Sequence, residues 1–433
     1  MSGNMMPGRL LVFCVILVSF GAGFFKASGY HSAEGFQVRP RVVPINSEPL
    51  LQSHFASSRQ HTQTHAASLI ELKDGRIRAF WFSGSREGAR DVEIHSAVFD
   101  PAQGQWGAEQ TVASREGTQQ SVLRYVSKLG NPVAGRAADG TLWLYYVTVS
   151  MGGWAGSSIT TMTSLDEGET WSPPRRLITS PFLNISTLVK GAPFLYADGT
   201  MGLPVYHEFI SKFGEILHLD RNGAVIDKQR LTAGGNGALQ PVVLVKNSSN
   251  ALALMRYSGA VLPRRVISVA TSDGGLHWTA PAKSALPNPD AALSAVMLPY
   301  GRMLAVLNNQ EQGRDALSLM VSPDGGSTWK TVYQLEDQLA ARTRPLDESA
   351  YLKVVAGLAR NTEGKIADAG EYAESAKRQA CTEQGCRFEF SYPYLIRAQS
   401  GDFHLVYTWN RSFIKHVWFT QAWLDQRLEK TSP

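Results

Sequence analysis

The chain has few cysteines and no cofactor motif, and these absences exclude several classes of protein. Its 433 residues include 3 cysteines. Cys14 lies near the N-terminus, whereas Cys381 and Cys386 are close enough to suit a short disulfide loop in an oxidising compartment. The sequence contains no Cys/His cluster with zinc spacing, no H-E-x-x-H motif and no G-x-x-x-x-G-K-S/T phosphate loop. We therefore expect neither a metal nor a cofactor.

The chain also lacks a large excess of charge of either sign. The 42 Lys and Arg residues against 37 Asp and Glu residues leave a net charge of +5, with a pI of about 9.0. Hydrophobic residues make up 43% of the chain and charged residues 18%, as in ordinary globular proteins. No basic run of the kind that binds nucleic acid occurs, so we expect no nucleic-acid partner. The mild positive charge weakly favours acidic ligands.

Only one long apolar run is present, over residues 10–25, directly after Arg9. It is shorter than the ~20 residues that a membrane-spanning helix needs, but it suits the hydrophobic region of a secretory signal. We interpret residues 1–30 as a signal peptide or a signal anchor. The protein is therefore expected to be exported to the periplasm or the extracellular space, or to be attached to the membrane through residues 10–25 with the remainder outside the cytoplasm.

An eight-residue pattern occurs three times, at 164–171, 271–278 and 322–329. Each copy has Ser or Thr two positions before its acid, Gly two positions after it and Trp five positions after it. The acids Asp166, Asp273 and Asp324 can accept backbone N–H groups in a tight turn, Gly permits a positive φ, and Trp packs between sheets. We interpret the pattern as structural rather than catalytic. Repeats at this spacing indicate a β-propeller.

A second repeat predicts the number of blades. Hairpin turns that enter a strand occur at 73–81, 138–146, 197–206, 300–307 and 400–407, with a Gly-less copy at 247–255. The intervals between their glycines predict an all-β, six-bladed propeller of four-stranded blades over residues 40–425. A double β-sandwich is the alternative. Residues 331–388 break the rhythm and have helical character, so we expect a partly helical insertion there, either in the last blade or between blades 5 and 6.

The inner strands of a propeller converge on a central funnel, so polar residues early in each blade and in the following loops are candidates for one site. These candidates are His65, Arg86, Arg90, Asp91, Asn131, Lys190, Glu208, Gln240, Arg256, Arg314, Tyr392 and Arg411. Each has a plain structural interpretation as well, such as a buried histidine or a salt-bridged acid. As a set they suit an anionic sugar, because arginine binds a carboxylate in bidentate geometry.

Several stretches resemble the sialidase (neuraminidase) superfamily, in its BNR/Asp-box "predicted neuraminidase" branch. Besides the Asp-boxes, the stretches are H-A-A-S-L-I-E-L-K-D-G, L-P-V-Y-H-E-F, L-Q-P-V-V and S-Y-P-Y-L-I-R. The resemblance implies three arginines on a substrate carboxylate, a tyrosine nucleophile assisted by a glutamate, and an aspartate acid/base. It makes Tyr392 the nucleophile, Asp91 the acid/base, and Arg256 and Arg314 the second and third arginines.

The sequence departs from that family at two positions. His65, in T-H-A-A, stands where the first arginine is expected. Gln240, in L-Q-P, stands where the activating glutamate is expected, and Glu208 is a substitute from another blade.

Three functions therefore stay open. The leading hypothesis is an exported hydrolase of the exo-α-sialidase type acting on acidic glycans, in which Tyr392 attacks the anomeric carbon and Asp91 protonates the leaving oxygen. The second is a uronate lyase, in which His65 or Tyr392 takes the C5 proton and an arginine stabilises the resulting anion. The third is a propeller that binds acidic glycans without turnover, for which Gln240 is the main support.

Overall fold

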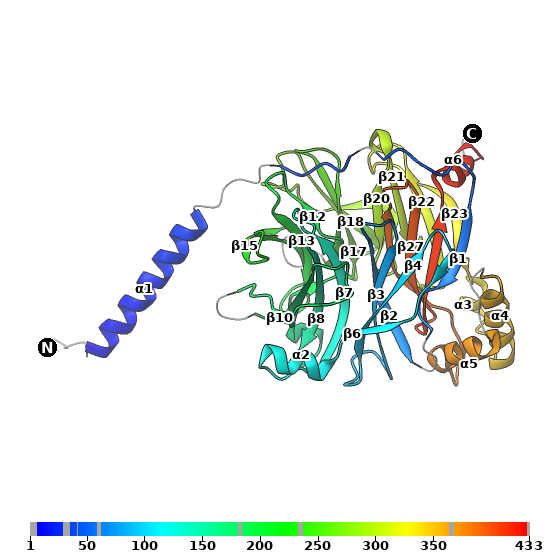
Figure 1. Cartoon of the computed structure of the whole chain (residues 1–433), viewed down its shortest axis with the longest axis horizontal. Coiled ribbons are helices and arrows are strands. Elements are labelled where there is room, and N and C mark those ends of the chain that lie inside the picture. Colours follow the sequence, from blue (N-terminus) through cyan, green and yellow to red (C-terminus); the bar gives the residue numbers. More distant parts are fainter. Residues whose placement is uncertain are drawn as a thin grey trace.

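The computed structural model describes residues 7–28, 35–40, 42–58, 62–180, 184–232, 237–362 and 368–430. Within these ranges six antiparallel sheets stand around a common axis as the blades of a propeller (Figure 1). The predicted all-β, six-bladed architecture is confirmed. A double sandwich is excluded, because the strands of the body form six sheets rather than two.

Each blade runs from an inner to an outer strand. Blade 1 contains β2 (Gln63–Glu71), β3 (Ile77–Gly84), β4 (Glu93–Asp100), β5 (Gln105–Trp106) and β6 (Gln110–Ala113). Blade 2 contains β7 (Lys128–Arg136), β8 (Leu142–Val149), β9 (Ser157–Ser164) and β10 (Arg175–Arg176). Blade 3 contains β11 (Leu188–Val189), β12 (Phe194–Leu195), β13 (Met201–His207), β14 (Phe213–Leu219) and β15 (Val225–Arg230). Blade 4 contains β16 (Ala238–Val245), β17 (Ala251–Tyr257), β18 (Arg265–Thr271) and β19 (Ala282–Pro287). Blade 5 contains β20 (Ser294–Met297), β21 (Met303–Leu307), β22 (Ala316–Ser322) and β23 (Lys330–Asp337). Blade 6 contains β26 (Phe390–Arg397), β27 (Phe403–Trp409), β28 (Phe413–Phe419) and β1 (Leu51–Phe55).

The ring closes through the N-terminal strand. β1 pairs antiparallel with β28, from the last blade, and supplies the outer strand of blade 6. Before it, the chain crosses blades 3 and 4, where the Phe36 N–H donates to the Ser248 carbonyl at 2.7 Å and the Phe36 ring stacks on Tyr196. The segment over residues 51–55 is thereby joined to the last blade.

Successive strands of a blade run in opposite directions, so the structural turns and the candidate site lie on opposite faces of the propeller. Turns between first and second strands, and between third and fourth strands, lie on one face of the ring, and loops between second and third strands lie on the opposite face. The Asp-boxes occupy the first face: Asp166 accepts the Thr170 N–H at 2.9 Å, and Asp324 accepts the Thr328 N–H at 2.8 Å. The hydroxyl and N–H of Thr170 lower the pKa of Asp166 to about 2. These acids bind their own turns.

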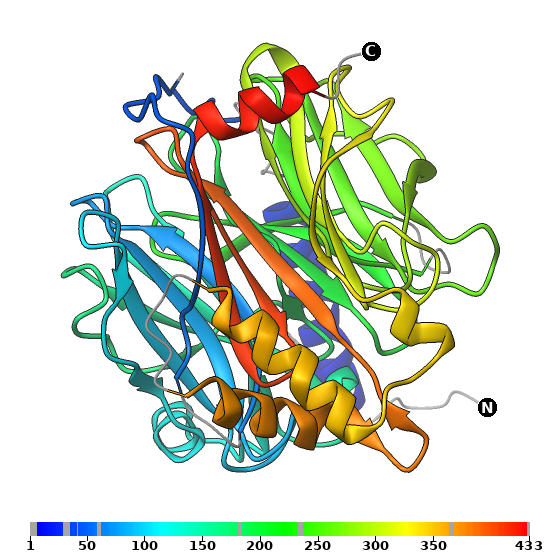
Figure 2. The same ribbon diagram turned by 90° about the vertical axis from the view of Figure 1, so that its right-hand side faces the viewer.

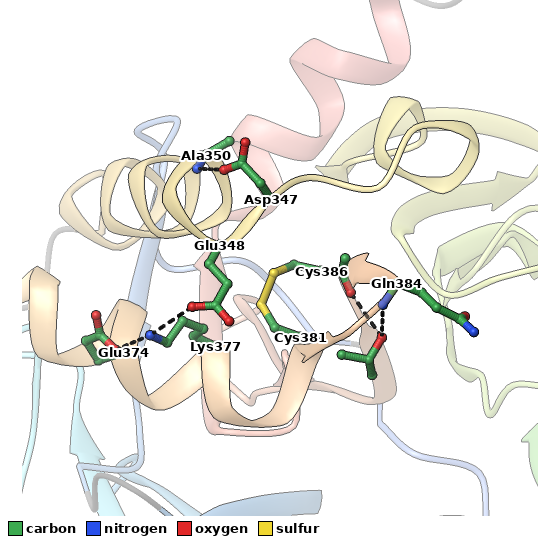
Figure 3. Close-up of a disulfide and its surroundings, with 10 residues drawn as sticks. Asp347, Glu348, Ala350, Glu374, Lys377, Cys381, Gln384 and Cys386 are labelled. Carbon is green, nitrogen blue, oxygen red and sulfur yellow. Dashed lines mark hydrogen bonds and ion pairs between the residues drawn. A yellow bond between two sulfur atoms is a disulfide. The ribbon is translucent and has the colours of Figure 1, made fainter.

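Helices occupy the connection between blades 5 and 6. They are α3 (Ala340–Thr343), α4 (Glu348–Arg360) and α5 (Ala369–Ala380), followed by the hairpin of β24 (Cys381–Thr382) and β25 (Gly385–Cys386). α4 and α5 lie over blade 6 (Figure 2), where Tyr372 stacks on Phe413 with ring centroids 4.2 Å apart. A disulfide joins Cys381 to Cys386 across the hairpin (Figure 3).

The predicted start of the insertion, residue 331, was wrong. Residues 331–337 belong to β23, because they pair with β22 as the outer strand of blade 5. Residues 363–367, which the prediction also included, lie outside the described residues.

The remaining helices lie outside the six sheets. They are α1 (Pro7–Ser28), α2 (Arg115–Val122) between blades 1 and 2, α6 (Gln421–Lys430) after the last strand, and the 3₁₀ turns η1 (Trp154–Gly156) and η2 (Pro299–Gly301). α1 contains the apolar run and exposes Leu11, Phe13 and Val18. Over the described ranges, no helix is both long and apolar enough to span a membrane. The ends of the proposed leader, residues 1–6 and 29–30, lie outside those ranges, and export and anchoring stay predictions.

Candidate functional site

Four of the inner strands carry the same bulge at the end that faces the site. In blades 1, 2, 4 and 6 two inner-strand residues lie opposite one partner residue. The first residue of each pair has a positive φ: 54° at Ala66, 41° at Asn131, 55° at Gln240 and 54° at Tyr392. A left-handed non-glycine residue costs on the order of 1 kcal/mol, and bulges redirect side chains beside active sites.

Proline follows three of these residues, in Asn131-Pro132, Gln240-Pro241 and Tyr392-Pro393. Proline fits the second bulge position because it has no N–H to lose from the ladder. The X-Pro dipeptide at the start of an inner strand is therefore the sequence signal for this arrangement.

The bulges bring polar groups of blades 2, 3, 4 and 6 together. The Tyr392 hydroxyl accepts the Gln240 Nε2 at 3.3 Å and the Arg256 Nη1 at 3.4 Å. The Tyr206 hydroxyl accepts the Asn131 Nδ2 at 3.1 Å and the Gln240 Nε2 at 3.4 Å. Each phenolic oxygen thus accepts two side-chain N–H groups, and Gln240 joins the two tyrosines. Burial by itself would lower the pKa of Arg256, but the facing Tyr392 and Asp290 outweigh burial and raise it.

One residue links two of the predicted arginines. The Asp290 carboxylate accepts the Arg256 Nε at 2.6 Å, and the Asp290 backbone carbonyl accepts the Arg314 Nη2 at 2.7 Å. Asp290 has a φ of 62° directly before the inner strand of blade 5. It fixes the spacing of the two guanidinium groups.

Glu389 joins Arg314 to a third arginine. Its carboxylate accepts the Arg314 Nη1 at 3.1 Å, the Arg411 Nε at 2.6 Å and the Ser391 Oγ at 2.9 Å. Burial alone would raise the pKa of Glu389, but Arg411 and Arg314 reverse this effect and lower it to about 2. Glu389 is therefore an anion at neutral pH and orients both arginines.

His65 and Lys190 complete the centre without making ion pairs to described residues. The His65 ring packs against the Tyr392 ring with centroids 4.3 Å apart, and burial lowers its pKa to about 3, so His65 is neutral at pH 7. The Lys190 Nζ donates to the Pro393 carbonyl at 3.2 Å and lies 4.9 Å from the centre of the Tyr394 ring. Burial lowers the pKa of Lys190 to about 7.

The remaining candidates lie around this centre. Burial raises the pKa of the Glu208 carboxyl, which Arg256 opposes. The Asp91 carboxylate accepts the N–H and the hydroxyl of Ser85 at 2.9 Å each, within its own exposed loop. Arg90, in the same loop, donates to the Tyr125 hydroxyl at 3.3 Å.

The loop over residues 85–91 nevertheless borders the cluster. The Glu87 carboxylate lies 3.9 Å from the Arg411 Nη1. The exposed Arg86 makes no ion pair with any residue that the structure describes.

One contributor, Glu389, was missing from the prediction, and two others, Asp290 and Tyr206, were included in it only as members of candidate stretches. Glu389 follows the irregular insertion and stands outside any repeat, so no pattern marks it. Asp290 and Tyr206 lie in stretches that the repeats mark as inner strand and strand end, but only the contacts distinguish them from their neighbours. Within the described ranges, no group of three or more His, Cys, Asp or Glu residues is arranged to hold a metal ion.

The profile of the family described as "BNR repeat-like domain" matches residues 75–405. Comparison with curated proteins yields no match. Among solved structures, a Hadza microbial sialidase is similar at a TM-score of 0.59 and 15% identity, over 83% of this chain and 66% of that one. This chain thus spans just under two thirds of that protein's length.

Two further structures are matched over nearly their whole length. The intramolecular trans-sialidase from Ruminococcus gnavus, in complex with oseltamivir carboxylate, has a TM-score of 0.58 and 12% identity over 88% of this chain and 98% of that one. A protein of unknown function from Dyadobacter fermentans has a TM-score of 0.60 and 12% identity over 85% and 98%. At these identities the likeness shows a shared fold.

Proposed function

This chain belongs to the BNR repeat-like family of the sialidase superfamily, and we propose that it is a glycoside hydrolase of the exo-α-sialidase type that acts on acidic glycans. The observation that carries the proposal is the position of Tyr392. Its hydroxyl lies where the inner strands of the blades converge, and it accepts N–H groups from Gln240 and Arg256. A phenol held in this way is prepared to act as a nucleophile.

Three arginines supply the site for the substrate's carboxylate. Arg256 and Arg314 are linked through Asp290, and Arg314 and Arg411 are linked through Glu389. Guanidinium groups bind carboxylates in bidentate geometry. In the family, an arginine stands at the position that the neutral His65 occupies in this chain. We assign the role of that arginine to Arg411.

The reaction follows from these positions. The Tyr392 hydroxyl gives its proton to solvent as its oxygen forms a bond to the anomeric carbon; the bond to the leaving oxygen breaks, and a carboxylic acid gives its proton to that oxygen. Water then attacks the anomeric carbon and gives one proton to the same carboxylate, and the departing Tyr392 oxygen takes a proton back from solvent. A neutral phenol approaching next to a carboxylate avoids the repulsion that an anionic nucleophile would meet.

Two acids compete for the proton transfer. The family resemblance favours Asp91, whose loop borders the cluster through Glu87. Glu208 is supported by its raised pKa, which keeps part of it protonated nearer neutral pH. The variant of the true acid, Asp91→Asn or Glu208→Gln, should lose activity on natural glycans and keep activity on aryl glycosides, whose leaving group needs no proton.

Tyr392→Phe tests the proposal, with Tyr394→Phe as the matched control. Tyr394 lies two residues further along the same strand and is buried, and among the described residues no hydrogen bond joins its hydroxyl to Gln240 or Arg256. Both variants and the wild type are incubated with a panel of sialylated and uronate-containing oligosaccharides, and the products are weighed by mass spectrometry. We expect the wild type and Tyr394→Phe to add one water per cut bond and Tyr392→Phe to lose at least a thousandfold in rate.

The product mass also separates the alternatives. Cleavage without addition of water, giving an unsaturated uronate, would replace the hydrolase with a lyase in which neutral His65 is the base. Binding of an acidic oligosaccharide with no cleavage would assign the chain to glycan recognition. Unchanged turnover in Tyr392→Phe would remove the nucleophile assignment.

We also propose that the protein works outside the cytoplasm. The apolar run in α1 and the disulfide between Cys381 and Cys386 both support this location, because disulfides persist in oxidising compartments. Fractionation of the producing cell should place the chain in the periplasmic, membrane or extracellular fraction, and recovery from the cytosol alone would contradict the proposal.

A further inference from the structure

A cavity lies beside the Tyr392 centre, between the blades and the helical insertion. It has a volume of about 420 Å³, within the range of ligand pockets. Its walls come from three parts of the chain. These are the loop between β21 and β22 in blade 5, the helical insertion, and two segments of blade 6, one directly before β26 and one directly after β27. The side chains that matter are Arg314, Arg342, Arg387, Arg411, Asp315 and Glu389.

The cavity has an excess of positive charge. Four arginines face two carboxylates, which leaves two positive charges. Asp315 pairs with Arg342, whose Nε lies 2.8 Å from the carboxylate, and Glu389 pairs with Arg314 and Arg411. Arg387 is exposed and makes no ion pair with any residue that the structure describes.

A buried donor in the wall also lacks a partner. Asn410 lines the cavity and is 1% exposed. Its side-chain oxygen accepts the Glu389 N–H at 3.1 Å, but its Nδ2 has no hydrogen-bond partner among the described residues. An unsatisfied buried N–H group is costly, so this part of the wall carries a donor that no described residue satisfies.

The insertion holds Arg387 in place at the cavity mouth. Arg387 directly follows the disulfide-closed hairpin, its N–H donates to the Ala380 carbonyl at 3.1 Å, and the preceding Cys386 N–H donates to the Leu346 carbonyl at 2.8 Å. Figure 3 shows this hairpin beside α4 and α5, where Lys377 bridges Glu348 and Glu374. The backbone of Arg387 is therefore held in place by covalent and backbone bonds.

We propose that this cavity is a subsite for a second anionic group, a sulfate or carboxylate on the sugar adjacent to the one that is cleaved. The proposal rests on the hydrolase function above. The cavity and the reaction centre share a wall, since Arg314, Glu389 and Arg411 line the cavity and Ser391, next to Tyr392, donates to Glu389. A chain of two acidic sugars can thus place one anion on Arg256 and Arg314 and the next beside Arg387 and Asn410.

Arg387→Ala and Arg387→Glu test the subsite, with Arg378→Ala as the matched control. Arg378 is an exposed arginine of α5, in the same insertion, and does not line the cavity. The kcat/KM of each full-length protein is measured on two oligosaccharides that differ only in whether the sugar next to the cleaved bond carries a sulfate or carboxylate. A charge-assisted hydrogen bond predicts a loss of about tenfold to a hundredfold for Arg387→Ala on the doubly anionic substrate.

On the substrate whose neighbouring sugar is neutral, the kcat/KM of Arg387→Ala should stay within about twofold of the wild-type value. The kcat/KM of Arg378→Ala should stay within about twofold on both substrates. Equal losses on both substrates, or no loss on the doubly anionic one, would overturn the subsite.

A binding measurement keeps this test separate from turnover. Glucosamine 6-sulfate, glucuronic acid and neutral glucose are titrated at millimolar concentrations into full-length Tyr392→Phe protein and into its Arg387→Glu double variant, and binding is followed by NMR of the sugar. Because the arginines at the Tyr392 centre can also hold an anion, the readout is the difference between the two proteins: we expect the sulfated sugar, the uronic acid or both to bind the single variant at least tenfold more tightly than the double variant, and glucose to bind neither. Equal anion binding to the two proteins, or none to either, would overturn the subsite whether or not the enzyme cleaves any glycan.

Discussion

Replacing Glu389 by glutamine should destabilise the protein and disorganise its arginines. Glu389 is the shared partner of Arg314 and Arg411, at 3.1 and 2.6 Å, and its side chain is 22% exposed. Glutamine keeps the shape but removes the charge, which leaves Arg314 without a carboxylate partner among the described residues and Arg411 with Glu87 alone, at 3.9 Å. Breaking such a pair costs more than the pair contributes, because the remaining charges stay partly buried.

The magnitude follows from the pKa of Glu389. Its ordinary value of 4.5 falls to about 2 in the folded protein. That difference corresponds to about 3 kcal/mol of stability at pH 7. A lowered folded pKa means that this stabilisation is complete above the ordinary pKa and is lost as the pH falls towards 2. By pH 3 about 2 kcal/mol of it should have disappeared from the wild type.

The assay is denaturant unfolding of the full chain, followed by tryptophan fluorescence at pH 7 and at pH 3. We expect Glu389→Gln to lower the free energy of unfolding by about 2–3 kcal/mol at pH 7 and by about 1 kcal/mol at pH 3, because protonation of the unfolded state has by then removed most of the stabilisation that the folded Glu389 anion provides. Glu374→Gln is the control, because its ion pair with Lys377 is at the surface and should contribute less than about 1 kcal/mol. Equal stability of Glu389→Gln and wild type at pH 7, or a difference that does not shrink at pH 3, would refute this reasoning.

Two further changes probe the centre. Gln240→Glu places a carboxylate 3.3 Å from the Tyr392 hydroxyl and should raise kcat at least tenfold as a base for the nucleophile; an unchanged or lower kcat would speak against a Tyr392 nucleophile. Lys190→Met removes a buried cation whose pKa falls from 10.5 to about 7 in the folded protein, so the variant should be more stable than wild type by about 5 kcal/mol below pH 7, with the gain shrinking as the pH rises towards 10. Unfolding measured across that pH range checks this, and a gain independent of pH would contradict it.

The repeats were sufficient to predict the architecture. The Asp-box acids and the turn glycines, such as Gly75 and Gly140, encode local geometry, because a positive φ and a carboxylate that accepts the turn's N–H groups depend only on neighbouring residues. Their spacing therefore predicts six blades. The helical insertion was found by the same local signals, although β23 was assigned to it wrongly because an outer strand alternates weakly and pairs on one edge only.

The composition of the site was predictable in part. Tyr392, Gln240, Asn131 and Arg256 begin or end strands that the repeats place at the funnel, and the structure brings them into one hydrogen-bonded cluster. For Asp91 the structure shows contacts within its own loop only, so its part in catalysis rests on the resemblance.

The sequence by itself determined the blades, the turns and the residue types that converge on the axis, since each of these depends on local periodicity. Only the tertiary structure decided which charges meet. Glu389 binds Arg314 and Arg411 from different parts of the chain, and Asp290 links Arg256 to Arg314. Ion pairs of this kind form between residues far apart in sequence and have no period. They exist because ring closure brings the ends of six blades to one face, where burial makes an unpaired charge costly.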